Sequence, residues 1–265
     1  MEISSIIDTQ LASLLGSGAV ATLRYAQLFQ ILPISLFGVS VAAVALPELS
    51  RDVTRENKEL LRRRVGEGIR QVAYFVLPSA FAFAVLGPQL VGTLFQTGAF
   101  DANDTALVGG VLAAYSLAIP AQAQIKLLAT GHYALGDTRT PVWIAAIAVV
   151  VSATSAFLLM QELGPAGIAL GAAAGAYVNV GLNAQRLSSK LGRLMHSTDV
   201  RDLSVSAAGC ALAAAATIGV IHWIDAAAIW VQAVCGLLAM GFVYGGATLA
   251  LGHPDARRMM RTLKK

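Results

Sequence analysis

The stretch QVAYFVLPSAFAFAVLGPQLVGTLFQTGAF, residues 71–100, decides the fold class. It is a run of thirty uncharged residues between Arg70 and Asp101. An α-helix rises about 1.5 Å per residue, so roughly 20 apolar residues cross a hydrocarbon core about 30 Å thick. The stretch is therefore long enough to span a bilayer as a single helix.

Six further runs reach a similar length, each with 21 to 29 uncharged residues. They occupy residues 25–47, 105–125, 140–161, 163–185, 203–224 and 226–254. The chain of 265 residues is 56% hydrophobic and 13% charged, and this charged share is about half that of a soluble domain. These features predict an all-α polytopic membrane protein with seven complete transmembrane helices and one partial N-terminal helix. They exclude a soluble enzyme.

The chain is expected to form one membrane domain, residues 1–265. Residues 1–15 carry apolar side chains at helical spacing but are too short to span a membrane. We interpret them as the second half of a spanning helix whose first half is missing. Complete spans are expected at about 19–46, 71–94, 102–128, 141–160, 166–187, 203–223 and 226–252, followed by a basic tail at 253–265.

Two of these spans begin with capping signals. Asp101 and Asp104 have the spacing of an N-cap residue and a third-position acid for the span at 102–128. Thr140 followed by Pro141 has the pattern of a cap and a first-turn proline.

Other residues predict the shape and contacts of the helices. Pro33 predicts a kink midway along the first span. The charged stretch Arg51–Arg64 predicts an amphipathic helix on the membrane surface. Small residues four apart permit close backbone approach in lipid, and this pattern occurs at Gly167, Gly171 and Gly175.

Basic residues are distributed asymmetrically among the connections. Seventeen of the 19 lysines and arginines follow the first, third and fifth spans or lie in the tail, and the intervening connections hold none. Lysine and arginine are retained on the cytoplasmic side of membranes, so a cytoplasmic C-terminus is expected. The basic clusters are accounted for by contacts with lipid headgroups, and no nucleic-acid partner is expected.

Arg24 is an ionisable residue within a span, where a charge is costly unless it faces a cavity or a partner. Gln27 and Gln30 follow at three-residue spacing, so polar groups mark one face of an apolar helix. One interpretation is a cationic cavity lining that binds an anionic substrate. The alternative is that Arg24, close to the Gly16–Gly18 turn, extends its side chain to the membrane interface.

Four further polar residues are candidates for a cavity lining or an ion site. Lys126 is expected to reach the inner interface more readily than a substrate. Asn179 and Asn183, four residues apart, are expected to hydrogen-bond between helices. Asp8 is a candidate for binding a cation or for pairing with Arg24, unless solvent reaches it. The two cysteines are expected to pack as small apolar residues, and neither a metal site nor an organic cofactor is implied.

Three segments resemble the MurJ/MviN lipid II flippase family of the multidrug/oligosaccharidyl-lipid/polysaccharide exporter superfamily. Residues 17–50 contain SGAV, YA, LP, FGV and LPELS; residues 94–117 contain LFQTGAF and AYSL; residues 133–142 read YALGDTRTPV, the most specific of the three. The order and spacing of these segments also agree with the family. The resemblance covers residues 1 to about 159.

The resemblance implies a fold of fourteen spans in two lobes, of which this chain corresponds to the C-terminal lobe. It implies alternating access around a central cationic cavity, with no covalent chemistry. The implied substrate is an undecaprenyl-pyrophosphate-linked peptidoglycan precursor, moved outward across the bacterial cytoplasmic (inner) membrane. Membrane lipids and a missing N-terminal lobe, or a second copy of the chain, are the other implied partners.

The sequence departs from the family pattern at the expected site. The family's Tyr-Ala-Asp-Arg is replaced by Tyr25–Leu28, so leucine stands where the cavity arginine is expected. Arg24 lies one turn earlier on the same face and is a possible substitute. The family acid three positions further on is Ile31 here. Asp8 matches one acid of the family's sodium site, but residues 141–160 contain no Asn or Asp.

The leading interpretation is a half-length lipid II flippase of the MurJ type. A related polysaccharide-lipid exporter is the alternative within transport, and the replaced residues Gln27, Leu28 and Ile31 fit it. The alternative from another class is a non-transporting membrane scaffold that packs through its Gly/Ala-rich helices and docks through Arg51–Arg64.

Overall fold

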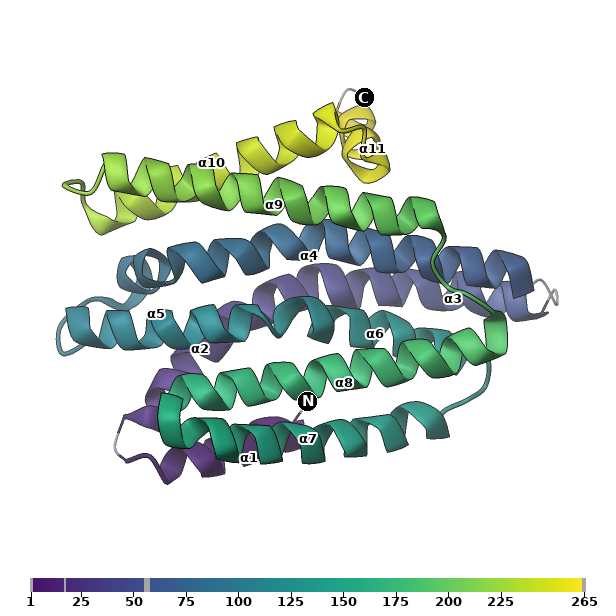
Figure 1. Cartoon of the computed structure of the whole chain (residues 1–265), viewed down its shortest axis with the longest axis horizontal. Helices are drawn as coiled ribbons and strands as arrows, with labels where there is room; N and C mark the ends of the chain where they lie inside the picture. Colours follow the sequence, from purple (N-terminus) through teal and green to yellow (C-terminus); the bar gives the residue numbers. More distant parts are fainter. Residues whose placement is uncertain (1, 17, 55–57, 264–265) are drawn as a thin grey trace.

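The computed structural model is a bundle of long helices (Figure 1). It describes residues 2–16, 18–54 and 58–263, and side-chain surroundings for 4–16, 18–51 and 58–260. The described elements are α1 (Glu2–Ser13), α2 (Ala19–Pro33), the π-helical segment η1 (Ile34–Val39), α3 (Ser40–Thr54), α4 (Lys58–Phe95), α5 (Ala102–Ser116), α6 (Ile119–Ala134), α7 (Arg139–Leu163), α8 (Pro165–Leu191), α9 (Ser197–Trp223), α10 (Ile229–Ala250) and α11 (Pro254–Leu263).

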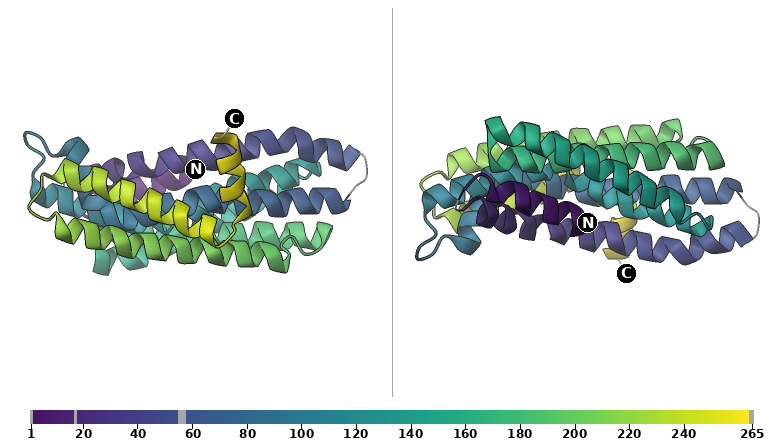
Figure 2. Two further views of the ribbon diagram at one scale, coloured as in Figure 1. Left: turned by 90° about the horizontal axis from the view of Figure 1, so that it is seen from above. Right: turned by 90° about the horizontal axis from the view of Figure 1, so that it is seen from below.

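Within these ranges, six segments are long and apolar enough to cross a membrane, or seven when the bent pair α5–α6 counts as one span. The prediction of an all-α polytopic membrane fold is confirmed. The long helices run side by side, and α9 and α10 pack against each other and against α4 (Figures 1 and 2).

The bundle has two chemically different ends. We call the basic end the one where α3 leads to α4, α6 to α7 and α8 to α9, and where α11 lies (Figure 1). The acidic end holds the opposite connections, which contain Asp101 and Asp225 but no lysine or arginine.

Pro33 is followed by a π-helical segment rather than by a simple kink in an α-helix. The helix passes from α2 through η1 into α3, and together residues 19–51 form one candidate span. Proline removes one backbone donor and crowds the preceding turn, and the wider π-helical turn accommodates this. Gly38 in η1 lies so close to α6 that an added Cβ would be 3.0 Å from the Ala123 Cα.

The span expected as one helix at 102–128 is two helices instead. α5 ends at Ser116 and α6 continues to Ala134, with a 42° bend between them. Pro120 in the first turn of α6 has no N–H with which to continue the ladder of α5. The segment expected as one span is therefore broken at Leu117–Ala118 into two helices.

The charged stretch Arg51–Arg64 belongs to two helices, α3 up to Thr54 and α4 from Lys58, and its expected place on the membrane surface stays a prediction. α3 and α4 continue toward the basic end, beyond the neighbouring helices (Figure 1), while residues 55–57 lie outside the described part. Leu49 and Leu61 are buried in a cluster with Val65. Ion pairs flank it, joining Arg64 to Glu48 and Arg63 to Glu67. The buried leucines and the Arg64–Glu48 pair therefore hold α3 against α4.

The two capping predictions have different outcomes. Asp101 and Asp104 form the expected capping box at the start of α5, with Asp101 accepting from the backbone N of residue 104 at 2.9 Å. Thr140 does not cap α7, which begins at Arg139. The side chain that accepts is Asp137, whose Oδ1 lies 3.0 Å from the Thr140 backbone N.

The small-residue pattern of α8 does permit close helix packing. α7 and α8 lie side by side (Figure 1). A Cβ added at Gly171 would lie 2.4 Å from the backbone N of Ala156, and similar clashes would arise at Gly167 and Gly175. The prediction of close backbone approach is confirmed, because no other residue type fits without displacing α7.

Candidate functional site

The face of α2 that carries Arg24 is open. Arg24 and Leu28 are exposed, while Gln27 is half-buried. A shallow pocket of about 360 Å³ is lined by Ala21, Arg24, Tyr25, Gln27, Leu28 and Ile31. The pocket therefore combines a guanidinium, an amide and the phenol of Tyr25 with apolar walls.

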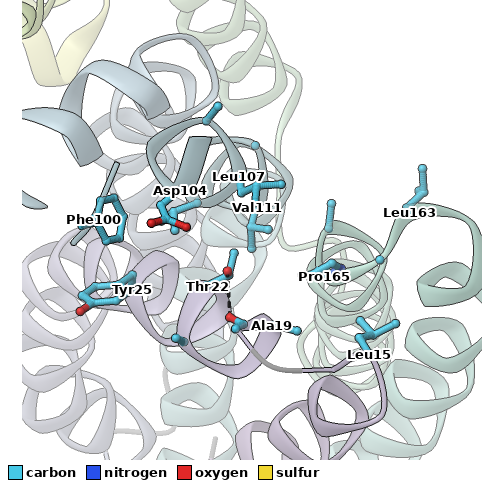
Figure 3. Close-up of a pocket in the computed structure, with 17 residues that line it drawn as sticks. Leu15, Ala19, Thr22, Tyr25, Phe100, Asp104, Leu107, Val111, Leu163 and Pro165 are labelled. Carbon is cyan, nitrogen blue, oxygen red and sulfur yellow. Dashed lines mark hydrogen bonds between the residues drawn. The ribbon is translucent and has the colours of Figure 1, made fainter. Parts of the chain in front are cut away.

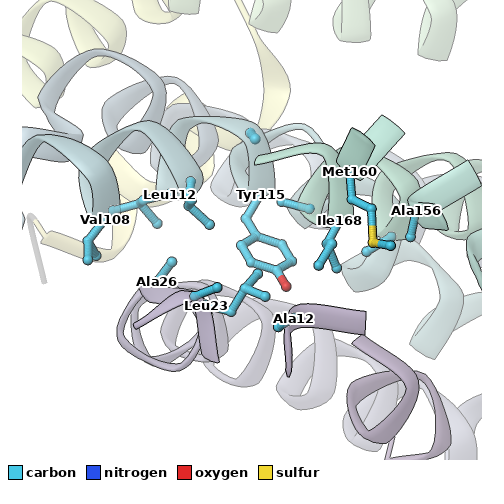
Figure 4. Close-up of a cluster of buried hydrophobic side chains, with 14 of the residues drawn as sticks. Ala12, Leu23, Ala26, Val108, Leu112, Tyr115, Ala156, Met160 and Ile168 are labelled. Atoms are coloured by element: carbon cyan, nitrogen blue, oxygen red, sulfur yellow. The ribbon is translucent and has the colours of Figure 1, made fainter. Parts of the chain in front are cut away.

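Gln27 links this face to the bundle interior. Its Nε2 donates to the Tyr115 hydroxyl on α5 at 3.1 Å. Tyr115 is only 1% exposed and lies in a buried cluster with Leu23, Ala26 and Leu112 (Figure 4). The Tyr115 hydroxyl points toward α2 in that cluster. Sequence pattern alone does not reveal this role, because a tyrosine in an apolar run is most often a core residue.

The structure does not bring all three predicted residues of α2 together. Gln30 is buried, and its Oε1 has no hydrogen-bond partner among the described residues. It does not line the Arg24 pocket. Successive steps of three residues rotate around a helix by about 60°, since the turn has 3.6 residues. The polar row therefore runs from the exposed Arg24 inward to Gln30.

Asp8 lies inside the bundle, 4% exposed, and its Oδ1 also has no partner in the described part of the chain. The ion pairs of the described residues do not include one between Asp8 and Arg24. Residues with metal-ligand side chains do not gather near it, since the described residues hold no group of three or more His, Cys, Asp or Glu suited to a metal ion. Cys210 and Cys235 are both free.

A second pocket lies at the acidic end, with a volume of about 640 Å³. It is formed by the end of α1, the start of α2, α5 and the α7–α8 turn (Figure 3). Its lining is mainly apolar, with Thr22, Tyr25 and Asp104 as polar members. Of the described residues that line it, none belongs to the candidate set from the sequence.

The asparagines of α8 form a buried polar chain with α6. Asn183 Nδ2 donates to Asn179 Oδ1 at 2.7 Å and to the Asn179 carbonyl at 3.0 Å. His132 Nε2 lies 3.4 Å from the Asn183 carbonyl oxygen. The two asparagine side chains therefore bond to each other within α8, and the one contact to α6 is made by the Asn183 backbone carbonyl, not by the side chain expected to bond between helices. Lys126 is half-buried on α6 and takes no part in these hydrogen bonds.

From His132 the polar contacts continue to more exposed residues at the basic end. Asp137, in the connection between α6 and α7, lies 3.5 Å from His132 Nδ1 and pairs with Lys190 of α8. The hydrogen bond from Lys190, with that from Thr140, holds the pKa of Asp137 well below its usual value. Asp137 thereby joins three elements at the end of the YALGD segment.

A larger charge cluster also lies at the basic end. Arg70 of α4 is buried with Asp255 at 3.1 Å, Asp199 at 3.3 Å and Asp202 at 3.8 Å. Sequence spacing did not point to this cluster, because its members are up to 185 residues apart. The arrangement fixes the starts of α9 and α11.

Comparison with known proteins gives the family. The family described as "Lipid II flippase MurJ" matches residues 1–238. A protein of Rhizobium meliloti named "Probable lipid II flippase MurJ" is 31% identical over 100% of this chain and 51% of its own length. The "Lipid II flippase MurJ" of Burkholderia cenocepacia is 33% identical over 84% of this chain and 42% of its own.

The fold agrees with a solved structure. The chain matches "Lipid II flippase MurJ, inward closed conformation" with a TM-score of 0.75 at 23% identity, over 94% of this chain and 50% of that one. This chain therefore spans about half the length of the relatives that it matches. Because the family match covers most of the sequence and agrees with its helical fold, the chain belongs to the MurJ lipid II flippase family.

Proposed function

We propose that this chain is the C-terminal half of a lipid II flippase and binds the pyrophosphate of its lipid-linked substrate through Arg24. The observation that carries the proposal is the exposed guanidinium of Arg24 in an apolar-walled pocket on a spanning helix. A cation at such a position is costly unless it serves an anion or reaches water. Arginine offers a planar pair of donors that matches a phosphate group.

Gln27 supports Arg24 as a second polar group of the pocket. Its amide is held by the Tyr115 hydroxyl, so the amide oxygen and the helix face keep a fixed orientation. Gln30 and Asp8 lie deeper, with acceptor oxygens that no described residue satisfies. In the proposed mechanism these oxygens accept hydrogen bonds from polar groups of the substrate, or from water around it. They do so as the cavity alternates between the two sides of the membrane.

We further propose that the basic end faces the bacterial cytoplasm, in the inner membrane. The support is the uneven distribution of lysine and arginine, which follows the rule for membrane insertion. Transport is then outward, from the basic end to the acidic end.

The proposed cavity needs a second wall. Two-lobed transporters hold the substrate between their lobes, and this chain spans about half the length of its relatives. We propose that it acts with an N-terminal lobe or with a second copy of itself. Purified chain alone in liposomes is then inactive, and rapid flipping by a monomer would contradict this point.

The test of the Arg24 role is complementation of a flippase-depleted strain by this chain together with the N-terminal lobe of a relative. Arg24→Ala should reduce transport roughly 10- to 100-fold, the loss expected for a charge-assisted hydrogen bond. Arg24→Lys should restore part of it. The double change Arg24→Ala with Leu28→Arg should also restore transport, because the two positions lie one turn apart.

The matched control is Arg193→Ala, since Arg193 is exposed in the connection between α8 and α9. It should transport normally, and all variants should reach the membrane in equal amount. Normal transport by Arg24→Ala would show that Arg24 only anchors α2 at the interface.

A related polysaccharide-lipid exporter remains the second candidate. It is favoured by Leu28 and Ile31, which are exposed and apolar on the same face as Arg24. Complementation of a strain that lacks such an exporter, together with failure in the flippase-depleted strain, would select it. Failure in both strains, with correct insertion, is the outcome expected for a membrane scaffold.

A further inference from the structure

The last described helix, α11, differs in direction from the spanning helices. α11 lies across the long axis of the bundle, whereas the spanning helices run along it (Figures 1 and 2). Gly252, with φ of +77°, ends α10, and the His253 backbone N donates back to the Thr248 carbonyl at 2.9 Å. Pro254 then starts α11. A direction across the bundle is a direction parallel to the membrane plane.

The first turn of α11 is fixed to the bundle. Asp255 pairs with Arg70, and Ala256 is 1% exposed in a cluster with Tyr74 and Met240. The ring of His253 is fully buried and stacks on Tyr74, with 4.6 Å between centroids. These contacts set the depth of α11 at the level where α4 and α9 carry their buried charges.

Beyond this turn the helix has two opposite faces. Steps of 100° per residue place Ala256, Met259 and Met260 on one face. They place Arg257 and Arg258 on the other. Ala256 is buried, but Met259 and Met260 are 44% and 38% exposed. The apolar face therefore starts against the bundle and continues past its edge.

We propose that α11 is an interfacial helix that binds the phosphates of anionic phospholipids through Arg257 and Arg258. A membrane surface offers chemistry for both faces, since acyl chains cover the methionines and anionic headgroups attract the basic face. Ala256 packs with side chains of the spanning helices α4 and α10, so the apolar face is turned toward apolar parts of two spanning helices. A soluble protein partner fits less well, because it would have to reach Met259 and Met260 at the level of the buried charges of α4 and α9.

The depth of α11 is tested by site-directed spin labelling in phosphatidylcholine–phosphatidylglycerol nanodiscs, after replacement of both native cysteines by alanine. A label at Met260→Cys should be accessible to oxygen and protected from a water-soluble nickel chelate. The control label at Thr198→Cys, exposed at the start of α9, should show the reverse. A Met260 label as accessible to the chelate as the control label would overturn the proposal.

The lipid preference is tested by native mass spectrometry with added phosphatidylglycerol. A basic residue near an anionic surface contributes about 1 kcal/mol, so each arginine removed should weaken binding roughly fivefold. Arg257→Gln with Arg258→Gln should therefore bind about 30-fold more weakly than the unmodified chain.

The matched control is Arg193→Gln with Arg201→Gln, which removes two exposed arginines at the same end but not on α11. Equal losses in the two double variants would overturn the assignment, because the effect would then be one of net charge. Displacement of the lipid by inorganic phosphate would also overturn it, since the site would then bind phosphate from solution.

Discussion

Arg70 and Asp255 form a buried ion pair, with 3.1 Å between Arg70 Nε and Asp255 Oδ2, although 185 residues separate them in the chain. The same guanidinium binds Asp199 through Nη1 at 3.3 Å. Both acids lie in the first turn of a helix, Asp199 in α9 and Asp255 in α11. One arginine of α4 therefore positions the starts of two helices that follow it by more than a hundred residues.

Arg70→Met should lower the free energy of unfolding by about 3–5 kcal/mol, because the carboxylates of Asp199 and Asp255 would stay buried without their partner. Thermal and denaturant unfolding in detergent micelles would measure the change. The control is Arg63→Met, whose side chain is 72% exposed beside Glu67 and should change stability by about 0.5 kcal/mol or less. Equal effects of the two substitutions would show that the buried pair contributes nothing specific.

Gly171→Val should prevent normal packing of α7 on α8. The added Cβ would lie 2.4 Å from the Ala156 backbone N, so the two helices would have to move apart. The control is Gly181→Val on the same helix, where an added Cβ meets nothing within 4 Å. Folded yield and unfolding temperature should fall for the first variant only. Similar yields of both variants would contradict the close approach.

The hydrogen bond between Gln27 and Tyr115 should be measurable as a coupling energy. In a double-mutant cycle of Gln27→Met and Tyr115→Phe, the two changes should be non-additive by about 0.5–1.5 kcal/mol. Gln27→Met leaves the buried Tyr115 hydroxyl without its partner, Tyr115→Phe leaves the half-buried Gln27 amide without its partner, and the double variant removes both groups. Additive effects on unfolding in micelles would show that the 3.1 Å contact has no energetic weight.

His253 should make the stability depend on pH. Burial lowers the pKa of His253 below its usual value, against the opposing influence of Asp255 and Asp202. The unfolded chain then binds a proton that the folded chain does not, so the free energy of unfolding falls as pH drops below about 6.5. The decline stops once pH is below the folded-state pKa.

His253→Gln should remove this part of the pH dependence. Comparison of the two proteins at pH 8, where histidine is neutral in both states, gives the cost of the substitution itself. The difference in free energy of unfolding between the unmodified protein and His253→Gln should then narrow as pH falls from 7 to 5. A constant difference over that range would show that His253 does not contribute.

Some features of the site follow from neighbouring residues alone, and others do not. The polar row of Arg24, Gln27 and Gln30 is visible in the sequence because helical spacing is local. Which of the three is exposed depends on the helices that cover α2, and these lie far along the chain. The exposed Arg24 and buried Gln30 are therefore known only from the structure.

The sequence by itself determined that this protein is an all-helical membrane bundle, because a helix satisfies its own backbone hydrogen bonds and uncharged runs need only lipid around them. It also determined the capping box of Asp101, a contact within one turn. Only the tertiary structure decided the bend at Leu117–Ala118 and the turn of α11 across the bundle. It alone paired Arg70 with Asp255, since such contacts join segments whose spacing in the chain carries no information about their distance in space.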